Sequence, residues 1–287
     1  MAAPSVDLDS LVRAIVGHCE EAPPEAGQPA PHYRRTANDH ISTVDALTHG
    51  YPLSLGTRAQ TRDAHLARLR SMVLVNLIES FERYLKEAAA ACVDLVRAYV
   101  FDARFNKLSV PTSAIAAHFG TGSLGRALCE SLVWTDTTEA NARFKALLAD
   151  PFVEGKFEVF PTGKPGSAGN RRSKTLDVVW QLRHTVVHNV GLITQSDAIK
   201  FQARLGGKVS HSGVLAPSHD DVHYLKQLLD ETVELADRRI ADRVGELLTA
   251  LYSDDPTLFE PQTEADKAAR TLGRPVTVAG AAGSPPL

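Results

Sequence analysis

The longest amphipathic pattern in the chain lies between Asp63 and Tyr99 and predicts one long helix. Its charged residues, such as Glu79 and Arg83, lie opposite a continuous apolar face. That face consists of Leu74, Leu77, Ile78, Phe81, Tyr84, Leu85, Cys92, Leu95, Val96 and Tyr99. A long helix with one apolar face is typical of an all-α bundle, so this pattern restricts the fold more than any other feature.

A second long helix is predicted after Ser218, whose hydroxyl can cap it, with Asp220 and Asp221 in the first turn where carboxylates favour the helix dipole. Its apolar positions are Val222, Leu225, Leu228, Leu229, Val233, Leu235, Ile240, Val244, Leu247, Leu248 and Leu251. Apolar density then falls, and the composition of residues 257–287 predicts a disordered tail.

Two shorter helices are predicted between these long ones, from Ser123 through Leu132 and from Thr137 or Thr138 through Leu148. The segment Gly120–Gly125 matches the Gly-x-Gly-x-x-Gly pattern of dinucleotide-binding proteins. That pattern requires a preceding strand and a βαβ unit, and the surrounding sequence predicts neither. We therefore interpret it as a loop in which Ser123 caps the following helix.

The sequence predicts three parts in the domain organisation. Residues 1–56 are expected to form a short helix over 5–19, a Pro/Ala/Glu-rich linker over 20–31 and an irregular loop region over 32–56 packed on the main domain. Residues 57–256 form the main helical domain, in which the glycine-interrupted segment 192–217 is either a small β-hairpin insert or an ordered loop. The tail completes the chain.

Composition excludes several classes of protein. The net charge of the 287-residue chain is −3, so any nucleic-acid binding must depend on a local basic patch. The three cysteines are odd in number and far apart, which is typical of a reducing compartment. We found no export signal and no apolar run long enough to span a bilayer, and we therefore expect a cytoplasmic protein.

The stretch Leu176–Gly191 combines helical apolar spacing with an unusual set of polar residues. One arc is predicted to contain Leu176, Val179, Trp180, Val186, Val187 and Val190. Arg183 projects into that arc and needs an anionic partner, whereas His184 and His188 are four residues apart and share a separate polar edge. Asn189 and Gly191 are expected to end the helix.

Arg183, His184 and His188, followed by Asn189, resemble the Arg-polar-x-x-x-His motif of the HEPN superfamily, the higher eukaryotes and prokaryotes nucleotide-binding domain. The resemblance spans about residues 60 to 252 and includes the order of long helices around the motif. It implies a HEPN-like helical bundle that dimerises and, in many members, a metal-independent endoribonuclease of the toxin or antiviral-defence kind. A separate antitoxin or nucleotidyltransferase partner is compatible with the resemblance.

RNA cleavage needs a base for the 2′-hydroxyl, positive charge for the phosphorane and an acid for the leaving oxygen. We assign His188 the general base or acid, Arg183 the phosphate contact, and His184 a supporting role. Since Arg183 and His188 are about 140° apart on a regular helix, a two-fold dimer is expected to complete the site. Asn189 either orients His188 or only caps the helix, and Glu82 is either the partner of Arg183 or a solvated residue.

The segment 161–174, just before this helix, is rich in glycine and proline and contains four cations. Lys164, Arg171, Arg172 and Lys174 are either ordinary solvated residues of a loop or contacts for an RNA backbone. No cofactor is expected.

Two other functions remain open from the sequence. His184 with His188, and His219 with His223, have the spacing of metal ligands on a helix, although the His-Glu-x-x-His pattern of metallohydrolases is absent. A non-catalytic module that binds nucleotides, RNA or a partner protein would keep the helices and need no reaction.

Overall fold

The computed structural model describes residues 28–50, 57–99, 116, 123–129, 132–148 and 157–281, and these residues form an all-α fold. Its helices are α2 (Pro29–Gly50), α3 (Thr57–Val96), α5 (Leu124–Cys129), α6 (Thr137–Leu148), α7 (Ala168–Asn189), α8 (Gln195–Leu205), α9 (His219–Asp254) and α10 (Pro261–Leu272). The all-α class predicted from the sequence is therefore confirmed. None of the described helices is long and apolar enough to cross a membrane.

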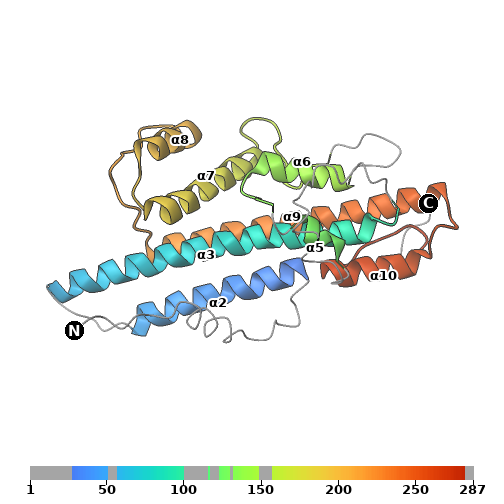
Figure 1. Ribbon diagram of the computed structural model, residues 1–287, viewed down its shortest axis with the longest axis horizontal. Helices are drawn as coiled ribbons and strands as arrows, with labels where there is room; N and C mark the ends of the chain where they lie inside the picture. Colours follow the sequence, from blue (N-terminus) through green and yellow to red (C-terminus); the bar gives the residue numbers. More distant parts are fainter. Residues whose placement is uncertain are drawn as a thin grey trace.

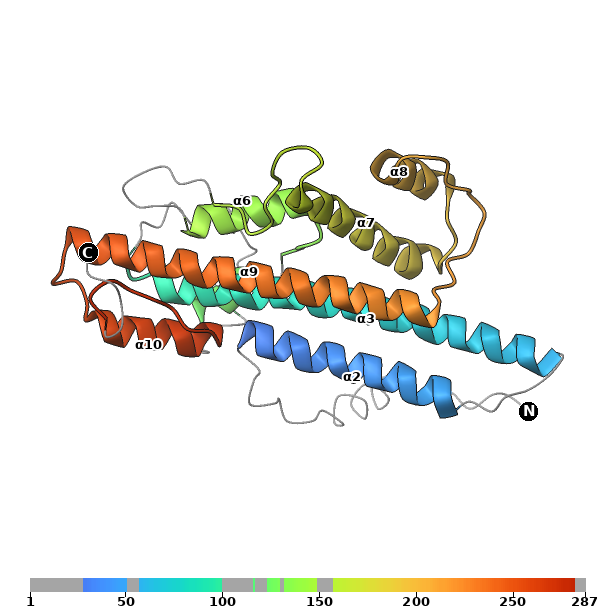
Figure 2. The same cartoon turned by 180° about the vertical axis from the view of Figure 1, so that it is seen from behind.

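The two longest helices, α3 and α9, lie side by side and form the centre of the molecule (Figures 1 and 2). Helices α2 and α10 follow one another along one side of this pair, whereas α6 and α7 lie along the other side. Helix α8 packs outside α7, away from the central pair. The start of α7 lies beside α6, and its end lies between α3 and the outlying helix α8 (Figures 1 and 2).

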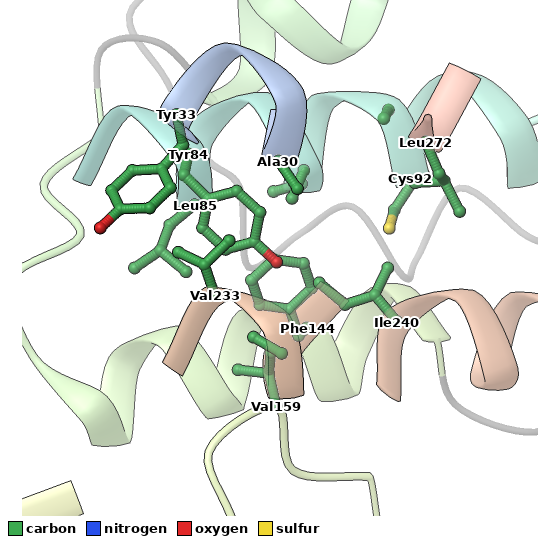
Figure 3. Packing of buried hydrophobic residues seen from close by; sticks show 14 of the residues in the cluster. Ala30, Tyr33, Tyr84, Leu85, Cys92, Phe144, Val159, Val233, Ile240 and Leu272 are labelled. Carbon is green, nitrogen blue, oxygen red and sulfur yellow. The ribbon is translucent and has the colours of Figure 1, made fainter. Parts of the chain in front are cut away.

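One hydrophobic core joins these helices apart from α8, whose buried residues Ala198 and Phe201 lie outside it (Figure 3). The ring of Trp180 on α7 stacks on that of Phe81 on α3 with centroids 6.0 Å apart, and Tyr33 on α2 meets Tyr84 edge-on at 6.3 Å. Phe81, Tyr84 and Leu77 are among the largest fully buried side chains. Burying a side chain of this size stabilises a fold by roughly 1.5–3 kcal/mol, so α3 contributes most where it faces α2, α7 and α9 together.

The loop predicted for residues 32–56 is wrong over the described part, because α2 occupies Pro29–Gly50. The apolar residues of its buried face are few, and two of them are small: Ala30, Tyr33, Ala37, Ile41 and Val44. Arginine and histidine residues between them hide the period in the sequence. Tyr33 donates a hydrogen bond to Asp230 (3.1 Å) and His223 contacts Asp45 (2.9 Å), so α2 runs antiparallel to α9.

The disordered tail predicted for 257–287 is also wrong where the structure describes it, up to residue 281. Glu260 caps α10 by accepting hydrogen bonds from the N–H groups of Gln262 and Thr263, and Gly273 ends the helix in the left-handed region. The buried face of α10 contains alanine at two positions and leucine at only one. The sequence therefore shows few large apolar residues here, although the face is buried.

The segment 192–217 contains helix α8 and an isolated antiparallel bridge between Leu192 and Val214, where a hairpin or an ordered loop was expected. The cap of the predicted shorter helix at Ser123 is confirmed, since its Oγ accepts the N–H of Arg126 (3.1 Å). The predicted helix over 5–19 and the glycines at 120 and 122 lie outside the described residues.

A half-buried ion-pair network holds the segment after α10 against α9. Arg274 binds Asp237 through Nη1 (3.1 Å) and Glu234 through Nη2 (2.8 Å). Burial raises the pKa of the Asp237 carboxyl more than Arg274 lowers it, whereas the hydrogen bond from Arg274 is the main cause that lowers the pKa of Glu234 to about 2.

We expect Arg274→Leu to lower the free energy of unfolding by about 3 kcal/mol, because Asp237 is then buried without its partner. The loss should shrink as the pH falls, since a protonated Asp237 needs no counter-charge and Glu234 loses its own contribution below its unfolded pKa. Urea unfolding at pH 7 and at about pH 3 measures both effects, because the ordinary pKa of Glu234 is 4.5 and its pKa in the folded protein is about 2.

Arg238→Leu is the matched control, because Arg238 forms an exposed pair with the same Glu234 (3.2 Å). It should change stability by less than about 1 kcal/mol. Equal losses for the two variants would contradict the importance of burial at Asp237.

Candidate active site

Helix α7 positions the motif residues, and both of its ends are capped. At the start, Ser167 accepts a hydrogen bond from the N–H of Asn170. The helix therefore begins eight residues before Leu176, the first residue of the predicted stretch. At the end, Val190 adopts a left-handed conformation (φ 52°, ψ 37°), followed by Gly191 (φ 81°). The N–H groups of both residues donate to the Thr185 carbonyl, which fixes the last turn containing His188.

The predicted apolar arc of α7 is only partly buried. Leu176, Val179 and Trp180 are in the core, but the exposed fraction reaches 45% for Val187 and 87% for Val190. The buried face of the second half is polar and includes Gln181 and Thr185. The helix thus leaves the core after Trp180, and its last apolar residues face solvent in the single chain.

The buried carboxylate of Asp197, on α8, ties the end of α7 to α8. It accepts hydrogen bonds from Gln181 Nε2 (2.9 Å), Asn189 Nδ2 (2.7 Å) and Thr194 Oγ1 (2.8 Å), and from the Thr194 N–H (3.2 Å). Burial tends to raise the pKa of Asp197, but these hydrogen bonds and the nearby His184 lower it overall. Asp197 is therefore a fixed negative charge beneath the motif, and Asn189 serves this contact.

His184 and His188 lie together on the exposed surface of α7. Their ring centroids are 4.7 Å apart and the rings are tilted by 44°. Within the described residues neither imidazole forms a hydrogen bond, and no third Asp, Glu, Cys or His ligand completes a metal site with them. Both rings are therefore accessible to a molecule that docks on this face.

Arg183 points toward α3, where its Nη2 binds Glu79 Oε1 at 3.1 Å. The expectation that Glu82 is its partner is wrong: Glu82 lies one turn nearer the core, pairs with Lys86 (3.3 Å) and accepts the N–H of Trp134 (3.4 Å). The Nε of Arg183 is buried and has no hydrogen-bond partner among the described residues. The side chain of Arg183 is 26% exposed, so part of it is accessible beside the Glu79 carboxylate, whereas its Nε is not.

The four cations of segment 161–174 do not form one mobile loop, because α7 already begins at Ala168. Arg171 donates to the Gly166 carbonyl (2.7 Å), and Arg172 pairs with Glu231 on α9 (3.0 Å). Lys164 and Lys174 are exposed. From Arg171 to His188 the helix rises by about 25 Å, so these cations lie at the opposite end of α7 from the histidines.

Within one chain the motif therefore remains divided. The histidine pair lies on the outer face of α7 close to α8, whereas Arg183 faces α3. Exposed Val187 lies between these two directions on the helix surface. A phosphate group bound to Arg183 would not reach His188 of the same helix comfortably, since the two positions are about 140° apart.

Comparison of the chain with protein-family models, with curated proteins and with solved structures found no match.

Sequence reasoning missed two residues that shape this site, Glu79 and Asp197. Asp197 carried a readable signal: Thr194 and Asp197 form a capping box, in which each side chain accepts the backbone N–H of the other residue. That spacing predicts a helix start at Gln195. Glu79 carried no such signal, because several carboxylates follow one another on α3 and only the angle between helices selects one.

We expect Asp197→Asn to destabilise the contact between α7 and α8 by about 1–3 kcal/mol, because an amide turns N–H groups toward donors that need an acceptor. Amide hydrogen exchange over residues 195–205 should accelerate. The difference from wild type should persist at about pH 4 and shrink only at lower pH, because hydrogen bonds hold the pKa of Asp197 below its ordinary value in the native protein.

Asp242→Asn is the control, an exposed carboxylate on α9 without a described partner. It should leave exchange in α8 unchanged. Unchanged exchange in Asp197→Asn as well would show that the carboxylate does not hold α8 in place.

Proposed function

We propose that this protein is a metal-independent endoribonuclease whose active site combines Arg183 of one chain with His184 and His188 of a second copy. The observation that carries the proposal is the pair of neighbouring, exposed imidazoles at the fixed end of α7, on the same helix as the partly exposed Arg183. The resemblance of these residues to the HEPN motif supports the same reading. A toxin or antiviral-defence role in the cytoplasm is part of this proposal.

The chemistry follows from the residue types. A neutral imidazole of His188 removes the proton of a ribose 2′-hydroxyl, and the resulting oxygen attacks the adjacent phosphorus. The guanidinium of Arg183 stabilises the charge on the phosphorane oxygens. The bond to the 5′-oxygen then breaks, and a second imidazole, that of His184 beside His188 on the same chain, donates a proton to that oxygen. The products are a 2′,3′-cyclic phosphate and a 5′-hydroxyl.

A homodimer is proposed because exposed apolar residues lie on α7 beside the motif, on α8 and in the segments that flank α8. Val187 and Val190 on α7 are joined by Leu192, Ile199, Leu205 and Val214, all of which are substantially exposed. Covering such residues with a second copy removes apolar surface from water and brings two motifs face to face across a two-fold axis. Each Arg183 could then meet the histidines of the other chain.

RNA would bind along the outer surface of α7 under this proposal. Lys164 and Lys174 are the exposed cations at the far end of the helix and are proposed to contact the RNA backbone. Arg172 contributes less, since Glu231 already neutralises it. Arg171 stays near the helix start, where it also binds the Gly166 carbonyl.

A second candidate is a non-catalytic module that binds a partner protein, such as an antitoxin or a nucleotidyltransferase. The ion pair between Arg183 and Glu79 favours it, because it gives the arginine a purely structural role. The exposed apolar residues would then receive the partner. The two proposals differ in one respect: only the nuclease requires the imidazoles.

We expect purified protein to cleave single-stranded RNA in EDTA. His188→Ala and Arg183→Ala should each lower the single-turnover rate about 10²- to 10⁴-fold, and His184→Ala should lower it less. The double variant should be little slower than either single variant, since both residues act on one transition state. Circular dichroism and thermal melts in the same buffer establish that the variants are folded.

The variant Glu79→Gln tests whether Arg183 binds the RNA phosphate or has only a structural role. It removes a negative charge that competes with phosphate for Arg183, so RNA affinity at low salt should rise while α3 keeps its shape. Glu139→Gln, an exposed glutamate on α6, is the matched control and should leave affinity unchanged. Cleavage at the wild-type rate by folded His188→Ala would refute the nuclease and favour the partner-binding module.

A further inference from the structure

A cluster of three side chains at the start of α9 lies apart from the motif described above. Asp45, near the end of α2, directs Oδ1 toward His223 Nε2 (2.9 Å) and His219 Nε2 (3.3 Å). The two rings have centroids 4.6 Å apart. The three potential ligand atoms all lie within 4.8 Å of one another. We propose that Asp45, His219 and His223 bind a divalent late transition-metal ion of the zinc class.

The local structure makes this convergence a property of the fold. Ser218 and Asp221 form a capping box that fixes the first turn of α9. His219 and His223 therefore lie one above the other on one face of the helix. Because α2 runs antiparallel to α9, Asp45 reaches that face from a position 178 residues away from His223 in the sequence.

The three ligand atoms are close enough together to bind one ion after a small outward shift. In a tetrahedral zinc site with bonds of about 2.0–2.2 Å, neighbouring ligand atoms are roughly 3.3–3.6 Å apart, slightly more than the separations found here. Here one carboxylate oxygen faces two imidazole nitrogens at similar separations. Two protonated imidazoles would place two positive charges against a single carboxylate, whereas one divalent ion between neutral imidazoles uses both nitrogen lone pairs.

The donor set selects the class of ion. Two imidazoles and one carboxylate favour zinc, cobalt, nickel or copper over magnesium and calcium, which prefer oxygen ligands. All three side chains are partly exposed, so an ion can enter from solvent and complete its coordination with water. The first turn of a helix disfavours a cation, but Asp220 and Asp221 offset that field.

A bound ion would join the end of α2 to the start of α9. This contact lies where α9 emerges from the segment that follows α8, so the metal would hold the bundle at that end. The proposed role is structural and does not depend on the nuclease proposal, because none of the three ligands belongs to the α7 motif.

The test uses the untagged full-length chain, stripped with EDTA and dialysed against Zn²⁺. We expect one zinc per chain, a higher melting temperature with zinc, and visible absorption typical of tetrahedral Co²⁺ when cobalt replaces zinc. His223→Gln and the isosteric Asp45→Asn should each weaken zinc binding by more than about 100-fold. Replacing a residue that only hydrogen-bonds a metal ligand typically weakens binding by about 10- to 100-fold. Circular dichroism verifies that both variants are folded.

The matched control is His184→Gln with His188→Gln, the other histidine pair of the same spacing, which lacks a facing carboxylate. It should bind zinc as wild type does. The proposal is overturned if wild type takes up no zinc at micromolar concentrations, if folded His223→Gln and Asp45→Asn keep wild-type affinity, or if the control loses the ion instead.

Discussion

The packing of α3 against α9 is the contact on which the other helices depend. Both are long, and together they supply much of the buried apolar surface, including Phe81, Tyr84, Val233 and Ile240. A helix with one apolar face is marginal in water alone, so each gains its stability from the neighbours that cover that face. Helices α2 and α10 cover one side and α6 and α7 the other (Figure 1). Most buried residues of α7 lie in its middle, from Ser173 to Gln181, whereas Val187 and His188 in its last turn are exposed.

The change of environment along α7 creates the candidate site. Trp180 is in the core, whereas four residues later His184 is exposed. After Trp180 the helix is held by hydrogen bonds instead of apolar contacts, since Gln181 and Asn189 both donate to Asp197. A buried carboxylate that accepts four hydrogen bonds is held in place, because each bond helps to offset the cost of burying its charge. The exposed imidazoles thus stand on a fixed support, which preorganises them for a reaction or a partner.

The sequence predicts this fold best where burial repeats with a regular period. Leu74 to Tyr99 and Val222 to Leu251 carry large apolar residues, and α3 and α9 follow them closely. Helices α2 and α10 were missed because alanine forms much of their buried faces, and alanine fits a solvated segment equally well. At the site, residue types suggested which side chains converge on α7, but not that Arg183 selects Glu79 over Glu82, because that choice depends on how α7 is set against α3. The sequence also grouped Val187 and Val190 with the apolar residues of α7 that are buried. An apolar arc on a helix does not show whether residues of the same chain cover it.

The central claim is that Arg183 of one chain acts with His188 of another. Mixing Arg183→Ala protein with His188→Ala protein, with subunit exchange allowed, tests it most directly. If the site is composite, half of the dimers are mixed and each contains one intact site, so cleavage in EDTA should return to about a quarter of the wild-type rate. Adding Val187→Glu to both proteins should abolish the recovery by preventing pairing. No recovery from folded proteins that demonstrably exchange subunits would contradict the account.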